Sequence, residues 1–165
     1  MESQMRATLI SCLFVACVSP PTPSTIDGLP PAEEPDLQYI EWVTIPPGEA
    51  SPELVARVIS DSERTPVAFI SASWCGSCKA YKGTLETERM KQVHARVHIL
   101  EFSLDDHKGL LSSLNIHPAG VPHWEGLAPS GQSSGKKTDG RAWEADTLDA
   151  MAPVLEPFFD DLAAL

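Results

Sequence analysis

The fold of this chain is decided by the stretch Val67-Ala68-Phe69-Ile70-Ser71-Ala72-Ser73-Trp74-Cys75-Gly76-Ser77-Cys78-Lys79. Its first five residues form a short apolar run, as expected for a strand in the middle of a sheet. The two cysteines that follow are separated by two residues, so they can close a small disulfide and open it again. A Cys-x-x-Cys between a strand and a helix predicts reversible thiol–disulfide chemistry.

The two cysteines have different expected roles. Cys75 should start a helix, where backbone N–H groups favour a thiolate and lower the pKa of the thiol from about 8.5. Cys75 is therefore the predicted nucleophile, and the more buried Cys78 resolves the mixed disulfide. Trp74 is expected to cover the pair as an apolar lid, and Lys79 either adds a nearby positive charge or is simply solvated. No cofactor beyond this disulfide is expected.

The dipeptide between the cysteines helps to set the reduction potential. Gly76-Ser77 contains neither the proline of strong reductants nor the histidine that stabilises the thiolate in strong oxidants. We therefore expect an intermediate to reducing potential. A reductant of this kind must be reloaded, and we expect a separate electron donor in the membrane to do so.

The composition limits the possible partners. The chain has 165 residues and a formal net charge of -11, which indicates about one domain and an acidic, solvated surface. Its basic residues are scattered, and only Lys136 and Lys137 are adjacent, so nucleic-acid binding is not expected. We expect a monomer that acts on the thiols and disulfides of partner proteins.

The N-terminus has the pattern of a secretory signal, predicted over residues 1–16. A polar start is followed by an apolar run at 7–16 that is too short to span a bilayer. The run ends at Cys17 in a pattern similar to that of bacterial lipoproteins, which predicts lipidation of Cys17. Cys12 is a second candidate, and an ordinary cleaved signal or an uncleaved apolar segment are the alternatives.

A proline-rich segment follows at residues 17–36, and such a segment does not form helix or sheet. We therefore place it outside the folded domain. It is either a tether that holds a lipid-anchored domain away from a membrane or a disordered leader. Together these features predict a location on the periplasmic side of the bacterial cell envelope, with a lipid anchor. The folded domain is then expected over residues 37–165.

The pattern of the domain predicts an α/β fold with a central mixed sheet flanked by helices. Strands are expected at 37–45, 67–71, 97–104, 122–127 and 136–141, and helices at 52–60, 76–85, 105–114 and 146–165. Pro153 or Pro157 should break or kink the last helix.

The strand, the Trp-Cys-Gly-Ser-Cys-Lys motif and Gly120-Val121-Pro122 resemble the thioredoxin superfamily. The chain looks most similar to the C-terminal thioredoxin-like domain of bacterial transmembrane thiol:disulfide interchange proteins. This resemblance implies a thioredoxin-like fold and a protein disulfide oxidoreductase activity. It also implies a cis peptide bond before Pro122, which lies against the cysteine pair and exposes the backbone of Val121 to a substrate peptide.

The chain departs from this family on the two central strands. The family has a buried acid six residues before the first cysteine, where this chain has Phe69. On the neighbouring strand, the position that usually carries a lysine is Glu101. We hypothesise that the acid has moved between strands and that Glu101 relays the proton of Cys78, because a carboxylate in an apolar strand needs a reason to be there. The alternative is a glutamate at a strand edge that reaches water.

The second departure follows Pro122, where His123 and Trp124 replace the first residues of an apolar strand. They either shape the partner groove or belong to an irregular edge.

Two other function classes stay open. One is a copper or zinc protein on the same fold, although one Cys-x-x-Cys supplies only two of the four usual zinc ligands, and His94, His98 and His117 are the nearest additional candidates. The other is a non-catalytic lipoprotein used as a binding platform. A simple c-type haem site is excluded, because Lys79 stands where a histidine is required.

Overall fold

A computed structural model describes residues 39–164 of the chain. The predicted signal peptide, Cys12, Cys17 and the tether lie outside the described residues, so those predictions stay open. Within residues 39–164, no helix is both long and apolar enough to cross a membrane.

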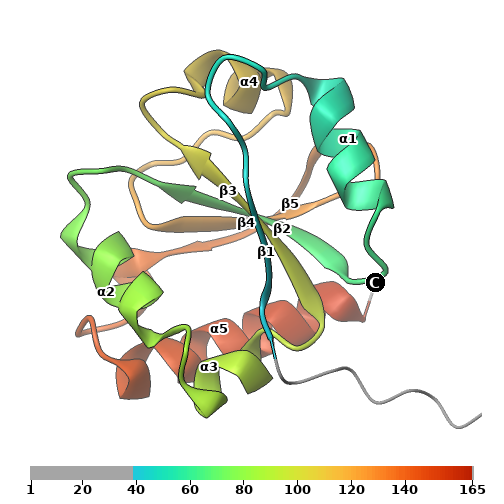
Figure 1. The fold of residues 1–165 in the computed structure, drawn as a ribbon. Coiled ribbons are helices and arrows are strands. Elements are labelled where there is room, and N and C mark those ends of the chain that lie inside the picture. Colours follow the sequence, from blue (N-terminus) through green and yellow to red (C-terminus); the bar gives the residue numbers. More distant parts are fainter. Residues whose placement is uncertain (1–38, 165) are drawn as a thin grey trace, which may run out of the picture. The chain divides into compact units, whose positions relative to one another are not determined.

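Five strands form one mixed sheet in the order β1-β3-β2-β4-β5 (Figure 1). β1, β3 and β2 run parallel to one another, β4 is antiparallel to β2, and β5 is antiparallel to β4. This confirms the mixed sheet expected from the sequence. The strands span Glu41–Thr44 (β1), Thr65–Ser71 (β2), Val97–Ser103 (β3), His123–Leu127 (β4) and Ser133–Asp139 (β5).

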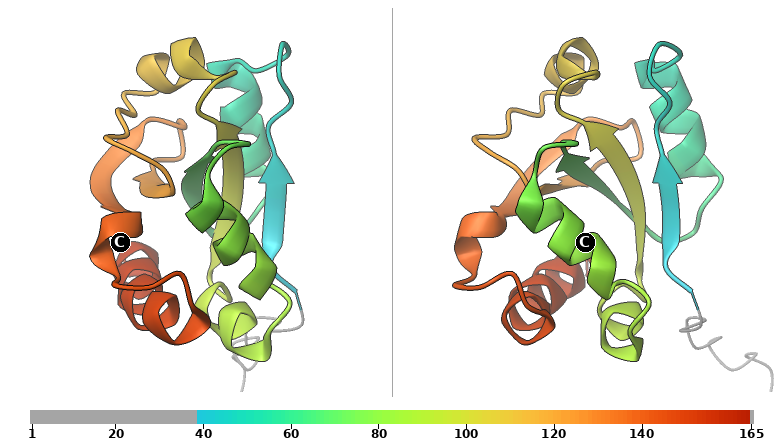
Figure 2. Two further views of the ribbon diagram at one scale, coloured as in Figure 1. Left: turned by 90° about the vertical axis from the view of Figure 1, so that its left-hand side faces the viewer. Right: turned by 60° about the vertical axis from the view of Figure 1, so that its left-hand side comes forward.

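Helices cover both faces of the sheet (Figure 1 and Figure 2). One buried cluster combines strand residues with residues of α2, α3 and α5 and contains both cysteines. The cluster on the other face involves α1 and α4. The helices are Pro52–Ser60 (α1), Gly76–Thr84 (α2), Glu88–Val93 (α3), Lys108–Ser113 (α4) and Leu148–Ala163 (α5), with a short 3-10 helix, η1, at Gly140–Ala142.

Local sequence signals explain several helix boundaries. Ser51 caps α1 by accepting a hydrogen bond from the backbone N–H of Leu54, and Pro52 occupies the first helical position, as the sequence predicts. The helix expected to run from the cysteine pair through Leu85 ends at Thr84, and Thr87 caps a separate α3 that the sequence analysis did not anticipate. A Thr cap three residues before the buried Met90 was the local signal for α3.

α5 does not break at its prolines. It runs continuously through Pro153 and Pro157, both of which are exposed. These residues lie four apart and so share one helix face, and the carbonyls that lose a partner there can bond to water. The opposite face holds the helix against the sheet through Met151, Ala152, Leu155, Phe159 and Leu162.

β4 is more deeply buried in the sheet than its sequence indicates. It lies between β2 and β5, and all five of its residues are buried, so His123 and Trp124 do not form an irregular edge or line an open groove. Gly126 is closely packed against α5, because a Cβ there would lie 2.5 Å from the Leu162 side chain, which would have to shift. Two polar side chains of this strand, His123 and Glu125, are buried and bonded to each other.

Candidate functional site

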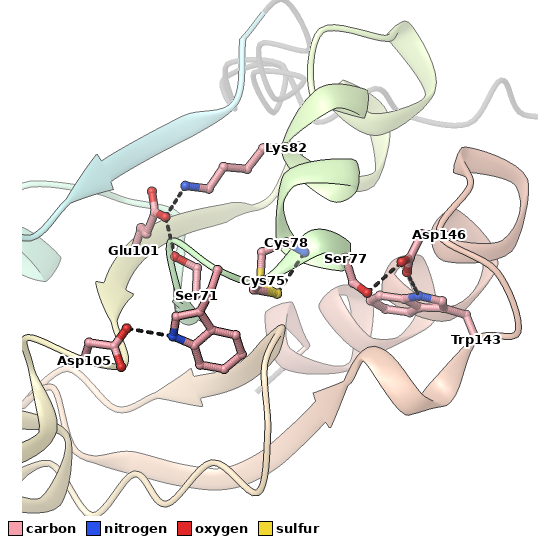
Figure 3. The surroundings of a disulfide bond; sticks show 10 residues. Ser71, Cys75, Ser77, Cys78, Lys82, Glu101, Asp105, Trp143 and Asp146 are labelled. Carbon is pink, nitrogen blue, oxygen red and sulfur yellow. Dashed lines mark hydrogen bonds and ion pairs between the residues drawn. A yellow bond between two sulfur atoms is a disulfide. The ribbon is translucent and has the colours of Figure 1, made fainter.

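Cys75 and Cys78 form a disulfide at the start of α2, directly after β2 (Figure 3). Cys75 is the N-cap of α2, and its Sγ accepts a hydrogen bond from the backbone N–H of Cys78 at 3.0 Å. Cys75 is 5% exposed and Cys78 is 1% exposed, so Cys78 is the more buried of the two, as predicted. The helix start therefore offers backbone donors to a thiolate at Cys75.

The loop before β4 meets the start of α2. The Val121–Pro122 peptide bond is cis, as the resemblance implies. A cleft of about 250 Å³ is lined by Ser77 from α2, by Val121 and Pro122, and by a wall from the end of β5 and η1. In that wall, Arg141 lowers the pKa of Asp139 to about 2 through its side-chain hydrogen bond, so Asp139 is ionised. The cleft thus lies beside Ser77, the residue before Cys78.

Trp74 and Lys79 lie on the surface beside the pair. Trp74 is 64% exposed, and its indole N–H donates to Asp105 at 2.9 Å. Most of the ring therefore faces solvent, whereas Trp143 belongs to the buried cluster that contains the cysteines. Lys79 is exposed, and no ion pair within the described part of the chain involves it.

Phe69 and Glu101 are direct neighbours in the sheet, because they are paired in the parallel register of β2 and β3. Phe69 is fully buried in an aromatic cluster with Trp42, Tyr81 and Trp124. Since residues paired in this way lie on the same sheet face, Glu101 lies on the face that carries α2 and the disulfide. A carboxylate therefore lies on the same sheet face as Phe69, one strand away.

Glu101 is held by groups from three other elements. Its carboxylate accepts hydrogen bonds from the hydroxyls of Ser71 and Thr44 and from the indole N–H of Trp42. Lys82 of α2 forms an ion pair with it (Figure 3). Glu101 is 7% exposed and lies on a strand with neighbours on both sides, so it is not a glutamate at a sheet edge.

The protonation of Glu101 follows from these partners. Burial favours the neutral acid and raises the pKa, but the hydrogen bonds from Lys82 and Ser71 and the positive charge of Lys82 outweigh it. The pKa of Glu101 therefore lies below its usual value, and the group is a carboxylate at neutral pH. Glu101 and Cys78 both line a cavity of about 350 Å³, which is large enough for water molecules between them.

In Figure 3, the carboxylate of Asp146 lies on the opposite side of the cysteine pair from Glu101, next to Ser77. Asp146 precedes α5, and its Oδ2 accepts a hydrogen bond from the Ser77 hydroxyl at 2.6 Å. Its Oδ1 accepts from the indole N–H of Trp143 at 3.0 Å. The dipeptide between the cysteines is thus attached to the C-terminal part of the domain.

The histidines considered as metal ligands are dispersed. His94 follows α3 and bonds to Tyr81 and to the Met90 carbonyl, and burial lowers its pKa to about 4. His98 is buried in β3 with one ring nitrogen 3.5 Å from Glu41, and His117 is exposed. In residues 39–164, no group of three or more metal-ligating side chains is arranged to hold a metal ion.

Several residues of the site escaped the sequence analysis. Lys82 is four residues after Cys78, so helical spacing alone places both on one side of α2 and could have identified it. No local signal pointed to Asp146, which is 69 residues from Ser77. The same is true of Trp42, which lies 59 residues before Glu101.

No protein-family model matches the sequence, and no curated protein matches it. Solved structures do match. The disulphide isomerase from Xylella fastidiosa Temecula1 is 14% identical with a TM-score of 0.53, and the match covers 73% of this chain and 97% of that one. A thioredoxin from Trypanosoma brucei brucei is 19% identical with a TM-score of 0.49, covering 83% and 99%. A mutant thioredoxin from Halobacterium salinarum NRC-1 is 22% identical with a TM-score of 0.48, covering 72% and 91%.

Because the identities are low, this likeness bears on the fold alone. The strand order, the helices on both faces and the match to the disulphide isomerase agree. The chain has a thioredoxin-like α/β fold, as the resemblance of its motifs implies.

Proposed function

We propose that this chain is a thiol–disulfide oxidoreductase that reduces or exchanges disulfides of partner proteins through Cys75 and Cys78. The observation that carries the proposal is the disulfide at the N-terminus of α2, beside the cleft that contains Pro122. A disulfide that served only stability would gain little here, because it closes a loop of a few residues.

The exchange proceeds in two steps, which together transfer two electrons to the partner disulfide. The Cys75 thiolate attacks one sulfur of the partner disulfide, which forms a mixed disulfide and releases the first partner thiolate. Cys78 then loses its proton and attacks the sulfur of Cys75. This second step closes the Cys75–Cys78 disulfide and releases the second partner thiolate, so that the partner is reduced and this chain is oxidised.

The buried Cys78 needs a proton acceptor in the second step, and we assign this role to Glu101. Glu101 is ionised at neutral pH and shares a cavity with Cys78. A water molecule in this cavity can pass the proton from the thiol to the carboxylate. Lys82 and the hydroxyls of Ser71 and Thr44 then favour release of that proton, because they stabilise the carboxylate.

The proposal is tested by equilibrating the chain with a glutathione redox series and counting free thiols by alkylation and mass spectrometry. We expect a two-electron transition with a potential nearer to that of thioredoxin, roughly −270 mV, than to that of strong periplasmic oxidants, roughly −120 mV. Cys75→Ser should remove the transition. Cys78→Ser should accumulate a mixed disulfide with insulin, used as a model substrate. A chain without any dithiol–disulfide transition would contradict the proposal.

We also propose that the domain acts on the periplasmic side of a bacterial envelope, anchored by a lipid at Cys17 and reloaded by a membrane electron donor. The support is the pattern of residues 1–36 alone. Expression in a bacterial host followed by mass spectrometry of the N-terminus should detect diacylglycerol on Cys17. Cys17→Ala should release the protein from the membrane fraction, whereas Cys12→Ala should not. A mature N-terminus elsewhere would disprove the anchor.

A further inference from the structure

Asp146 occupies a position that the exchange chemistry does not require. It approaches the start of α2 from the segment between η1 and α5, far along the chain from the cysteines (Figure 3). Both of its carboxylate oxygens are used, one by the Ser77 hydroxyl and the other by the Trp143 indole. Trp143 is 8% exposed and packs against Trp124, so it provides a firm anchor for this carboxylate.

The position of Ser77 makes this contact relevant to the redox pair. α2 begins at Gly76 with Cys75 as its N-cap, so Ser77 belongs to the first helical turn. The backbone N–H groups of this turn carry the partial positive charge of the helix end. In the reduced chain, the Cys75 thiolate and the Asp146 carboxylate are therefore two anions at one helix terminus. In the oxidised chain the thiolate is absent, and of these two groups the Asp146 carboxylate alone carries a negative charge.

From this geometry we infer that Asp146 is a positioning residue that makes the Cys75–Cys78 pair more reducing. Its carboxylate repels the Cys75 thiolate and stabilises the disulfide relative to the dithiol. Its hydrogen bond to Ser77 keeps this charge at the helix start. The inference rests on the proposed exchange activity and deepens it. It assigns part of the control of the reduction potential to Asp146, a residue outside the Cys-x-x-Cys motif.

The main test is Asp146→Asn, measured in the glutathione series. Asparagine keeps both contacts, since its amide can donate to the Ser77 oxygen while its carbonyl accepts from Trp143. Only the charge is lost. Because repulsion between two nearby unit charges in water is on the order of 1 kcal/mol, we expect the equilibrium to shift about fivefold toward the dithiol. This corresponds to about 20 mV. The pH at which Cys75 reaches half of its maximal alkylation rate should fall in parallel.

The matched control is Glu144→Gln, which removes the same charge from an exposed position two residues earlier in the same segment. It should leave the potential and the alkylation profile close to those of the wild type. In 1 M salt the effect of Asp146→Asn should shrink, because Asp146 is exposed and the screening length falls to about 3 Å. Thermal unfolding of both variants checks that the fold is intact.

Ser77→Ala removes the hydrogen bond and leaves the charge. If Ser77 holds the carboxylate in place, Ser77→Ala and Asp146→Ala should be non-additive in a double-mutant cycle on the potential. An unchanged potential in Asp146→Asn, or an equal shift in Glu144→Gln, would overturn the inference. A wild-type chain without any redox transition would instead overturn the proposed function, so the two failures are distinguishable.

Discussion

Two buried glutamates, Glu101 on β3 and Glu125 on β4, lie on opposite faces of the same sheet. Glu101 is paired in register with Phe69 on the face that carries the disulfide. Glu125 is paired with Ala68, which belongs to the cluster under α1 and α4. Each carboxylate has a cationic or ionisable partner and at least one hydroxyl donor, yet their surroundings differ.

The Glu125 carboxylate is buried and has two bonding partners. It accepts a hydrogen bond from the Ser133 hydroxyl, and His123 Nε2 lies 2.9 Å away. Burial raises the pKa of Glu125, but the hydrogen bonds from His123 and Ser133 outweigh this and lower it below its usual value. Glu125 is 2% exposed, and its side chain is bonded to partners on β4 and β5.

The Glu101 carboxylate is held as firmly but is open to cavities on two sides. It lines the cavity shared with Cys78 and a second one of about 370 Å³ beside Tyr39 and Trp42. Its partner Lys82 is 42% exposed at the side chain and can exchange with solvent. The two carboxylates therefore differ in the cavities that reach them, and a cavity of this size can hold the water that a proton relay through Glu101 would need.

The largest effect should come from Glu101→Gln, which keeps the size of the side chain and removes its basicity. We expect the closure of the mixed disulfide by Cys78 to slow by about 100-fold at neutral pH, the lower end of what a positioned base contributes. Stopped-flow kinetics of the second step across pH measures this. If the rate and its pH dependence match the wild type, Glu101 is not the proton acceptor.

Glu125→Gln is the matched control, because it makes the same change on the opposite face. It should leave the rate at which Cys78 closes the mixed disulfide unchanged. Loss of a charge-assisted hydrogen bond in a buried site should lower the free energy of unfolding by about 2 kcal/mol. Urea denaturation of the oxidised protein measures it. Slowing of the redox step comparable to that in Glu101→Gln would erase the distinction between the two sites.

Lys82→Gln should have a smaller effect on stability, about 1 kcal/mol, because solvent screens this partly exposed ion pair. Its main consequence concerns protonation. Lys82 provides the largest contribution that lowers the pKa of Glu101, so this pKa should rise in the variant. The acid limb of the rate profile should therefore move to higher pH. A limb that stays in place would show that Lys82 does not control Glu101.

The smallest effect concerns acid stability. Both glutamates have a pKa in the folded state below the ordinary value of 4.5. The stability that they contribute is present above pH 4.5 and is lost as the pH falls through their folded-state pKa values. Thermal unfolding between pH 5 and 2 should therefore show a shallower decline in Glu101→Gln and in Glu125→Gln than in the wild type. An equally steep decline in both variants would assign the acid sensitivity to other groups.

Much of the fold follows from local patterns. The apolar run before Cys75 became β2, and the Ser51-Pro52 signal became the start of α1. The burial of β4 could not be predicted from its sequence. It depends on Ser133 of β5, which bonds to Glu125, and on Leu162 of α5, which packs against Gly126. A break or kink was expected in α5, and the helix is not broken; sequence spacing does not reveal that both prolines face solvent.

The cysteine pair and its setting at a strand–helix junction could be read from the sequence, since they depend on residues that are adjacent along the chain. It also identified Glu101 as an acid in an apolar strand. Only the tertiary structure decided which groups surround the pair. Lys82 and Ser71 meet at Glu101, and Asp146 meets Ser77 across 69 residues. Such contacts arise from strand order and helix packing, which bring distant segments together, and no local pattern encodes them.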